Sequence, residues 1–91
     1  MIFLSSNIKW LRKRAKKSQG ILAEQLHITR EMLNSYEHGL ANPSLQVLVN
    51  MADYFGLSTD SLLRINLTTY HELQFRALLE KEQLKGHLEP K

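Results

Sequence analysis

Polar side chains crowd one face of a short helix predicted within residues 18–39, SQGILAEQLHITREMLNSYEHG. The segment is typical of two short helices joined by a tight turn, and the second helix would leave hydroxyl, amide, guanidinium and carboxylate groups exposed. Such groups, carried on a helix that fits the major groove, can form hydrogen bonds with the edges of base pairs. The segment therefore indicates recognition of nucleic acid. The exposed set consists of Thr29, Arg30, Glu31, Asn34, Ser35 and His38.

No residue pattern in the chain favours catalysis over recognition. The sequence holds no glycine-rich phosphate loop and no nucleophile elbow. Its four histidines, at positions 27, 38, 71 and 87, lack the spacing of metal ligands, and the absence of cysteine removes thiolate sites and disulfides. We therefore expect no catalytic residue, no metal site and no cofactor.

Positive charge is concentrated in the first part of the chain. Residues 1–40 hold seven Lys or Arg against three Asp or Glu, whereas residues 41–91 hold five against six. This asymmetry indicates one face that meets phosphate groups, although a solvated helix face gives the same pattern. No apolar run approaches the length of a membrane span, and the opening MIFLSS is too short for a signal peptide, so we expect a cytoplasmic protein without membrane contact.

Cap and turn signals predict three short helices before residue 40 and no convincing strand anywhere. One of the serines at positions 5 and 6 would cap the first helix, which runs to about Lys17. Ser18 and Thr29 would cap the second and third, and Gly39 would end the third in a left-handed conformation. The residues expected to face inward are Ile8, Leu11, Ala15, Leu22, Ala23, Leu26, Leu33 and Tyr36.

Three more helices are expected after residue 40. The fourth opens at residues 42–44 and ends at Gly56, and the fifth follows a cap at Ser58. A linker occupies residues 64–68, and the last helix then runs until Gly86 stops it. A second apolar stripe, Val47, Met51 and Tyr54, lies opposite the core face of the fourth helix. The core residues expected here are Leu45, Leu48, Val49, Ala52, Phe55, Leu62 and Leu63.

A longer pattern surrounds the two short helices. Its positions are Leu11-Arg12, Ser18-Gln19, Leu22-Ala23, Leu26, Ile28-Thr29, Leu33, Tyr36-Glu37, Gly39, Asn42-Pro43-Ser44-Leu45, Leu48, Ala52, Gly56-Leu57-Ser58 and Leu62-Leu63. In this order and spacing, residues 8–63 resemble the Cro/repressor-type helix-turn-helix domain of the Xre family. The resemblance implies an all-α, five-helix fold like that of the lambda repressor over residues 1–66. Residues 67–91 would add a C-terminal helix for dimerisation or partner binding.

The resemblance assigns roles to the exposed side of the third helix. Its base-facing positions correspond to Thr29, Arg30, Glu31, Asn34 and Ser35. Arg30 would pair with O6 and N7 of guanine, and Asn34 could read adenine. Glu31 could accept from a cytosine amino group, orient Arg30 through a salt bridge or act against wrong sites, and these alternatives stay open. Thr29 could cap the helix, contact a base or do both.

Contacts to the DNA backbone are also implied by the resemblance. The family's equivalent of Gln19 meets a phosphate beside the start of the second helix. Leu40 stands where the family often has a basic residue, so cations at the end of the first helix would compensate. The residues expected to contact phosphate are Lys13, Arg14, Lys17, Ser18, Gln19, His38 and Asn42.

Three further positions are expected to be structural. In similar domains the residues that match Arg12 and Glu37 form a partly buried ion pair, and we expect the same pair here. His27 occupies a turn position where the family often has glycine, because that residue needs a positive φ. We therefore expect backbone strain at His27.

The last helix carries two apolar stripes rather than one. Tyr70, Leu73 and Leu84 share one face at 100° per residue, and Phe75 and Leu79 lie nearly opposite. One stripe would pack on its own domain and the other on a second copy, which would set two recognition helices about 34 Å apart. Folding back entirely on its own domain is the alternative. The residues expected at the dimer interface are Tyr70, Leu73, Phe75, Leu78 and Leu79.

Together these features predict a sequence-specific, double-stranded-DNA-binding transcriptional regulator. The simplest form is a repressor that acts as a homodimer on a two-fold symmetric operator. One alternative is an antitoxin, which would bind DNA and neutralise a protein toxin. Another is an interaction module that sequesters another regulator through the last helix. That module would tolerate loss of Arg30 but not a charge at Phe75 or Leu79.

Overall fold

The computed structural model describes residues 1–88 of the 91-residue chain, and the side chains of residues 1–84. The described part contains six α-helices, one short 3₁₀ helix and no strand. This confirms the expected all-α fold of five helices with a sixth appended. The elements are α1 (Leu4–Arg14), α2 (Gln19–Gln25), α3 (Arg30–Glu37), α4 (Leu45–Phe55), α5 (Thr59–Arg64), η1 (Leu67–Thr69) and α6 (Glu72–Leu88).

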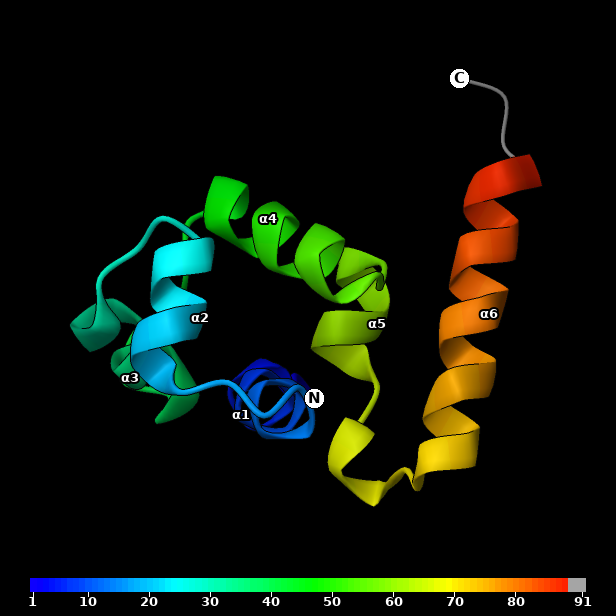
Figure 1. Ribbon diagram of the computed structural model, residues 1–91, viewed down its shortest axis with the longest axis horizontal. Coiled ribbons are helices and arrows are strands. Elements are labelled where there is room, and N and C mark those ends of the chain that lie inside the picture. The colour runs from blue at the N-terminus through cyan, green and yellow to red at the C-terminus, as the bar shows by residue number, and fades with distance from the viewer. Residues whose placement is uncertain (89–91) are drawn as a thin grey trace.

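Helix α1 lies near the centre of the molecule and is seen end-on in Figure 1. In that view α2 and α3 lie on one side of it, α4 crosses above it, and α5 leads down to η1. Helix α6 stands on the other side, so it lies at the opposite end of the molecule from α3. None of the helices in the described part is long and apolar enough to cross a lipid bilayer.

Side-chain caps start four of the helices. Ser18, Thr29, Ser44 and Ser58 each accept a hydrogen bond, at 3.0–3.2 Å, from the backbone N–H three residues ahead. Such a cap stabilises a helix by about 1 kcal/mol. The caps expected at positions 18, 29 and 58 are therefore confirmed.

The ends of α1 differ from the expectation. The helix begins at Leu4, so the serines at positions 5 and 6 lie inside it and neither caps it. It ends at Arg14 and not near residue 17, because Lys16 adopts a left-handed φ of 58°. Ala15, expected to face inward, is the C-terminal cap residue and is exposed.

Glycines follow α3 and α4 as expected. Gly39 and Gly56 have φ values of 70° and 73°, a region that only glycine adopts without a steric cost. Helix α6 departs from the prediction, since it starts at Glu72 after η1 and continues through Gly86 to Leu88. The expected stop at Gly86 is wrong. A single glycine costs a helix only about 1 kcal/mol relative to alanine, which is not enough to end it.

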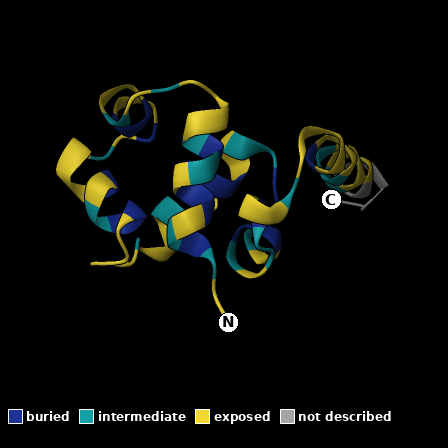
Figure 2. Cartoon of the chain, turned by 90° about the horizontal axis from the view of Figure 1, so that it is seen from below, coloured by how far each residue is buried: buried dark blue, intermediate teal, exposed yellow. Residues whose placement is uncertain are grey.

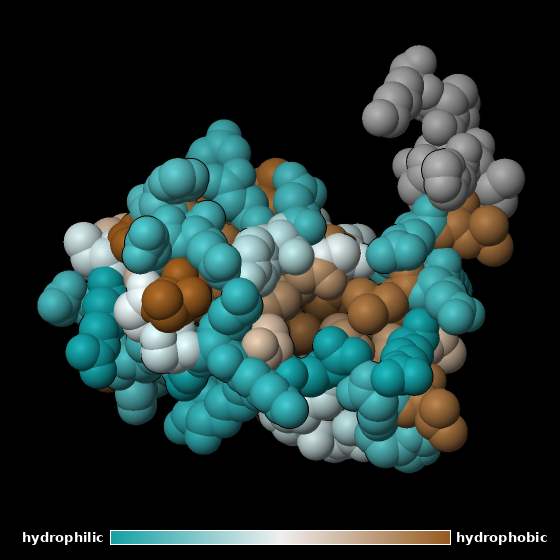
Figure 3. Space-filling model, in the orientation of Figure 1, coloured by the Kyte–Doolittle hydropathy of each residue, from teal (hydrophilic) through white to brown (hydrophobic). Residues whose placement is uncertain are grey.

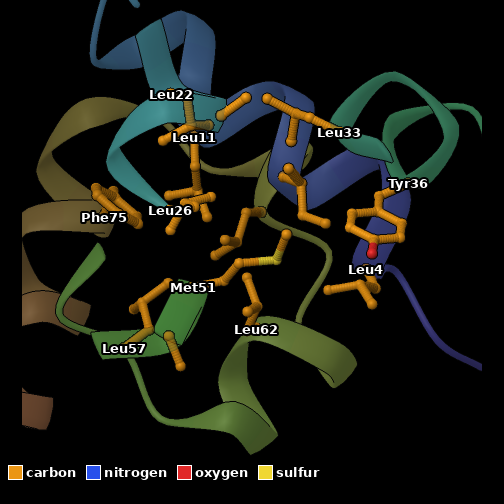
Figure 4. Packing of buried hydrophobic residues seen from close by; sticks show 14 residues of the cluster. Leu4, Leu11, Leu22, Leu26, Leu33, Tyr36, Met51, Leu57, Leu62 and Phe75 are labelled. Atoms are coloured by element: carbon orange, nitrogen blue, oxygen red, sulfur yellow. The ribbon is translucent and has the colours of Figure 1, made fainter. Parts of the chain in front are cut away.

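A single apolar core lies between α1, α2, α3, α4 and α5 and is extended by α6 (Figure 4). Figure 2 shows that its buried residues line the inward sides of the helices. Burying each large apolar side chain contributes roughly 1.5–3 kcal/mol. The buried members are Leu4, Ile8, Leu11, Leu22, Ala23, Leu26, Leu33, Tyr36, Met51, Ala52, Leu57, Leu62, Leu67 and Phe75.

Helix α4 is rotated relative to the expected core stripe. Met51, expected on the outer stripe, is fully buried, whereas Leu45 is 81% exposed and Val49 is exposed as well. The inward side of α4 runs through Leu48, Met51 and Phe55. Apolar residues on both sides of this helix allowed either orientation, and a flexible, unbranched methionine adapts readily to a buried position.

A buried asparagine joins α1 to the segment that follows α5. Asn7 Nδ2 donates to the backbone oxygens of Leu62 at 2.8 Å and Ile65 at 2.6 Å, and its Oδ1 accepts from the backbone N–H of Leu67 at 3.0 Å. Leu67 is itself buried, so residues on both sides of the expected boundary contribute to the same core. The boundary between residues 66 and 67 stays a prediction.

Helix α6 is attached to the rest of the chain through Phe75, which is 1% exposed. The rings of Phe75 and Trp10 meet edge-on with centroids 5.1 Å apart, and the Arg14 guanidinium lies 4.4 Å from the Phe75 centroid. Leu78 and Leu79 pack against the same core and are half-buried. The expectation that Phe75 forms a dimer interface is therefore wrong, because its own chain buries it.

The outward side of α6 is uncovered. Leu73 is 72% exposed and Leu84 is 61% exposed. In Figure 3 apolar surface follows the edge of the molecule that α6 forms, and more of it gathers between α6 and the α4–α5 segment. The two apolar stripes of the last helix thus have different surroundings: one packs on the chain itself and the other faces solvent.

Candidate nucleic-acid interface

Helices α2 and α3 are held at a fixed angle by buried side chains and by the turn between them. Leu22, Leu26 and Leu33 point into the core from the two helices. In the turn, His27 has a left-handed φ of 58°, and the backbone N–H of Ile28 donates to the oxygen of Ala23 at 3.0 Å. The positive φ expected at His27 is confirmed.

The outer side of α3 carries the residues expected to read bases. Thr29, Arg30, Glu31 and Asn34 are exposed, and Ser35 is half-buried. The Thr29 hydroxyl accepts from the backbone N–H of Met32 at 3.1 Å, so this residue caps the helix. Among the ion pairs of the described residues, none joins Arg30 to Glu31. Both side chains at the start of α3 therefore point to solvent without holding each other.

A buried ion pair holds the other end of α3 against α1. Arg12 Nε and Nη2 donate to the two carboxylate oxygens of Glu37 at 2.6 and 3.0 Å, and Arg12 Nη1 donates to the backbone oxygen of Lys17 at 3.0 Å. The Glu37 side chain has no exposed surface. The hydrogen bond from Arg12 to Glu37 raises the pKa of Arg12, although burial of the guanidinium on its own would lower that pKa. The expected ion pair is present, and it fixes α3 from the inside.

Gln19, the first residue of α2, reaches across to α3. Its Nε2 donates to Asn34 Oδ1 at 3.1 Å and to Glu37 Oε1 at 3.2 Å. No signal in the sequence indicates this contact, because residues on two different helices share no periodicity. It joins the buried ion pair to the exposed face of α3.

Most of the expected phosphate contacts lie where α2 begins or where α3 ends. His38 follows α3, and its Nδ1 lies 2.8 Å from the backbone oxygen of Asn34. Lys13 on α1 is exposed. Three of the expected phosphate contacts are exposed: Lys13, His38 and Asn42. Lys17 and Gln19 are half-buried, and the Ser18 hydroxyl caps α2.

Arg14 does not join this group. Its Nε and Nη2 donate to the two oxygens of Glu72, at 2.9 and 2.6 Å, while its guanidinium covers Phe75. Residues two apart on a helix point in nearly opposite directions, so Arg12 faces α3 and Arg14 faces α6. The expected phosphate contact of Arg14 is therefore corrected, because Glu72 of α6 already binds its guanidinium. The sequence held one signal for this role of Arg14. Trp10 and Arg14 are four residues apart, so they share a side of α1 that lies away from its core stripe.

The segment with this geometry also matches a known family. The sequence model of the helix-turn-helix family matches residues 8–62, which is more than half of the chain. The chain belongs to the helix-turn-helix family. The match agrees with the resemblance expected over residues 8–63, and it leaves η1 and α6 outside the family segment.

Two curated helix-turn-helix relatives come from Bacillus subtilis strain 168. The uncharacterized HTH-type transcriptional regulator YqaE is 37% identical over 60 residues, which are 66% of this chain and 52% of the relative. The SPbeta prophage-derived uncharacterized HTH-type transcriptional regulator YonR is 43% identical over 47 residues, or 52% of this chain and 44% of the relative. The chain thus spans about half the length of the curated relatives it matches.

Two solved structures share the fold. A transcriptional regulator from Listeria innocua has a TM-score of 0.68 at 24% identity, over 92% of this chain and 78% of its own. A chain in the complex of the SinR and SinI proteins has a TM-score of 0.64 at 25% identity, over 92% of this chain and 98% of its own. Both comparisons extend beyond the helix-turn-helix segment alone.

Proposed function

We propose that this helix-turn-helix protein binds double-stranded DNA sequence-specifically and regulates transcription. The observation that carries the proposal is the outer face of α3, where Arg30 and Glu31 are exposed while the Arg12–Glu37 ion pair holds the far end of the helix. A helix braced in this way can enter a major groove without losing its orientation. The names of both curated relatives, each an HTH-type transcriptional regulator, support the same function.

In the proposed complex Arg30 pairs with O6 and N7 of a guanine, a contact worth about 1–3 kcal/mol of discrimination. Glu31, Asn34 and Ser35 contact neighbouring bases. The backbone is held by Lys13, Lys17, Ser18, Gln19, His38 and Asn42. Each lysine that neutralises a phosphate adds about 0.9 to the slope of log affinity against log salt.

Selection from a random duplex pool at physiological salt tests this proposal. We expect an enriched motif, and we expect Arg30→Ala to remove the preference for guanine at one position within it. Arg64→Ala is the matched control, because Arg64 is an exposed arginine on α5 that lies outside the proposed contacts. The absence of any motif would contradict sequence-specific binding, and an unchanged motif with Arg30→Ala would show that Arg30 does not read a base.

We further propose that the protein acts as a dimeric repressor through the outward side of α6. The exposed Leu73 and Leu84 support this assembly, since one apolar stripe of α6 is left for a second copy. Analytical ultracentrifugation should show a dimer for the wild type and a monomer for Leu73→Asp. The control Leu40→Asp places the same charge on another exposed leucine and should leave the dimer intact. A monomeric wild type would contradict the proposal.

A protein partner is the second candidate, and one observation favours it. The structurally similar SinR chain was solved in a complex with the SinI protein, so this fold can bind another protein. A module that sequesters another regulator would bind it through α6. In that case Leu73→Asp would abolish the activity in cells, whereas Arg30→Ala would leave it unchanged. An antitoxin would differ from this module, because Arg30→Ala would weaken its DNA binding.

A further inference from the structure

A cleft of about 830 Å³ lies between α6 and the α4–α5 segment, at the end of the molecule opposite α3. Figure 3 shows apolar surface gathered in this part of the molecule. The apolar residues that line the cleft are Ala52, Leu57, Ile65 and Leu78. Sites for small organic molecules have volumes of roughly 300–1,000 Å³ and mostly apolar walls, so the cleft has the size and lining of such a site.

One carboxylate of the cleft is already held by hydroxyl groups. Ser58 Oγ donates to Glu82 Oε1 at 3.0 Å, and the Ser61 hydroxyl donates to the same oxygen. The backbone N–H of Ser58 points to it as well, at 3.4 Å. These donors would suit an anionic ligand, but Glu82 of α6 occupies them. The remaining polar groups of the cleft therefore decide which ligand it fits.

Those groups favour a positive charge. Three carboxylates, of Asp53, Asp60 and Glu82, line the cleft against the single ammonium of Lys81. Asp60 is paired with Arg64 at 3.5 Å, whereas Asp53 forms no ion pair among the described residues.

The end of α4 adds to this negative charge. Gly56, the C-terminal cap of α4, lies in the wall of the cleft. The C-terminus of a helix carries a partial negative charge, and basic side chains in the last turn usually offset it. The last turn of α4 has none. The cleft is thus negative on a chain whose net charge is +3.

We propose that this cleft binds a small organic cation, an amine with an apolar body. The apolar body packs against Leu57, Ile65 and Leu78, and the ammonium group lies beside Asp53 at the end of α4. Such a ligand contacts α6 and the helix-turn-helix segment at once, so it stabilises the attachment of α6. The site is separate from the exposed face of α3, and it does not depend on DNA binding by that face.

Three probes with one apolar body and different head groups test the proposal: phenylbutylamine, phenylbutanol and phenylbutanoate. Methyl NMR spectra of the full chain follow each titration. We expect phenylbutylamine to cause saturable shifts at Leu57, Ile65 and Leu78, and none at Leu33 in the core near α3. Phenylbutanol should bind more weakly, and phenylbutanoate at least about tenfold more weakly than the amine, because the carboxylate meets like charge.

Two variants at exposed positions test the charge preference. Asp53→Asn should weaken binding of the amine about two- to fivefold and leave binding of the alcohol unchanged. Gln83 Nε2 lies 3.8 Å from the position that a Cβ atom would take at Gly56, so its side chain reaches the end of α4. Gln83→Lys therefore places an ammonium where that of the ligand would lie, and it should weaken the amine at least about fivefold.

Gln46→Lys is the matched control for Gln83→Lys. It adds the same charge at the other end of α4, outside the cleft, and should leave binding of the amine unchanged. Circular dichroism melting establishes that each variant is folded.

Four results would overturn the inference. They are no saturable shift with the amine, equal binding of the amine and the alcohol, equal binding with Gln83→Lys, and cleft signals that change on dilution of the protein alone. The second would mean apolar adhesion without charge recognition, and the last would mean that another copy of the chain covers the cleft. An enriched DNA motif with no binding of the amine overturns the cleft alone, and the reverse outcome overturns only the proposed function.

Discussion

Arg14 and Glu72 form a two-pronged ion pair, with nitrogen–oxygen distances of 2.9 and 2.6 Å, that joins the last residue of α1 to the first residue of α6. Arg76, one turn further along α6, donates to the same carboxylate at 3.0 Å. The Arg14 guanidinium also covers the ring of Phe75. A basic residue of the N-terminal cluster is thus used to attach α6.

The attachment of α6 should weaken in acid. The Arg14 hydrogen bond lowers the pKa of Glu72 in the folded chain, with a smaller contribution from Arg76. A carboxyl group with a lowered folded pKa stabilises the fold above its unfolded pKa of about 4.3, and this stabilisation is lost as the pH falls through the folded value. Below about pH 4 we expect faster hydrogen exchange in α6.

Glu72→Gln is the control for this pH effect. The amide cannot titrate, so the variant should show rapid exchange in the first turns of α6 at neutral pH and no further step in acid. If wild-type α6 exchanges at the same rate at pH 3 and pH 7, after correction for intrinsic rates, the ion pair does not hold the helix.

Phe75→Ala should destabilise the fold by about 3–5 kcal/mol, because it leaves a cavity beside the core and removes the ring that Trp10 contacts. Urea unfolding followed by circular dichroism measures the change. The emission of Trp10, the single tryptophan, should shift to longer wavelength as its ring gains solvent. Leu40→Ala, at an exposed leucine outside α6 and outside the proposed interface, should cost less than about 0.5 kcal/mol. Similar losses for both variants would mean that α6 does not pack through Phe75.

Breaking the Arg12–Glu37 pair from one side should cost about 3–5 kcal/mol, because the remaining Glu37 carboxylate is fully buried. Arg12→Met tests this by chemical denaturation. The double variant Arg12→Met with Glu37→Leu should recover most of the loss, since two apolar side chains leave no buried charge. Equal stability of the single and double variants would contradict this account.

His27→Gly should stabilise the protein by up to about 1 kcal/mol. The left-handed φ of 58° costs a residue with a side chain about 1–2 kcal/mol. The greater freedom of glycine in the unfolded chain offsets about 0.4–1 kcal/mol of that gain. The melting temperature measures the result, and His38→Gly, at a φ of −97°, should lower it instead. A lower melting temperature for His27→Gly would mean that the imidazole itself stabilises the turn.

Local chemistry explains what the sequence predicted correctly. Ser18 and Thr29 satisfy backbone N–H groups of their own helices, and Gly39 and Gly56 supply a conformation that few other residues adopt. These signals depend on neighbours within a few residues, so they can be read without a tertiary structure. The early end of α1 was missed because Lys16 adopts a left-handed conformation that its residue type does not favour.

Tertiary packing explains what the sequence could not predict. Helix α4 is apolar on two sides, and only its contacts with the other helices decide that Met51 is buried and Leu45 exposed. The amide chain from Gln19 to Asn34 joins two helices whose relative position comes from the core. The role of Arg14 depends on Glu72 and Phe75, which come much later in the sequence.

The contact between Trp10 and Phe75 has a consequence for biosynthesis. A ribosome adds about 5–20 residues per second, so the 65 residues that separate the two rings take roughly 3–13 s to make. During that time α1 has emerged, but the partner of its tryptophan has not. The nascent helix-turn-helix segment therefore exposes an aromatic edge to chaperones and to other chains. Its fold is completed by a side chain that is made after the helix-turn-helix segment and lies far from α3.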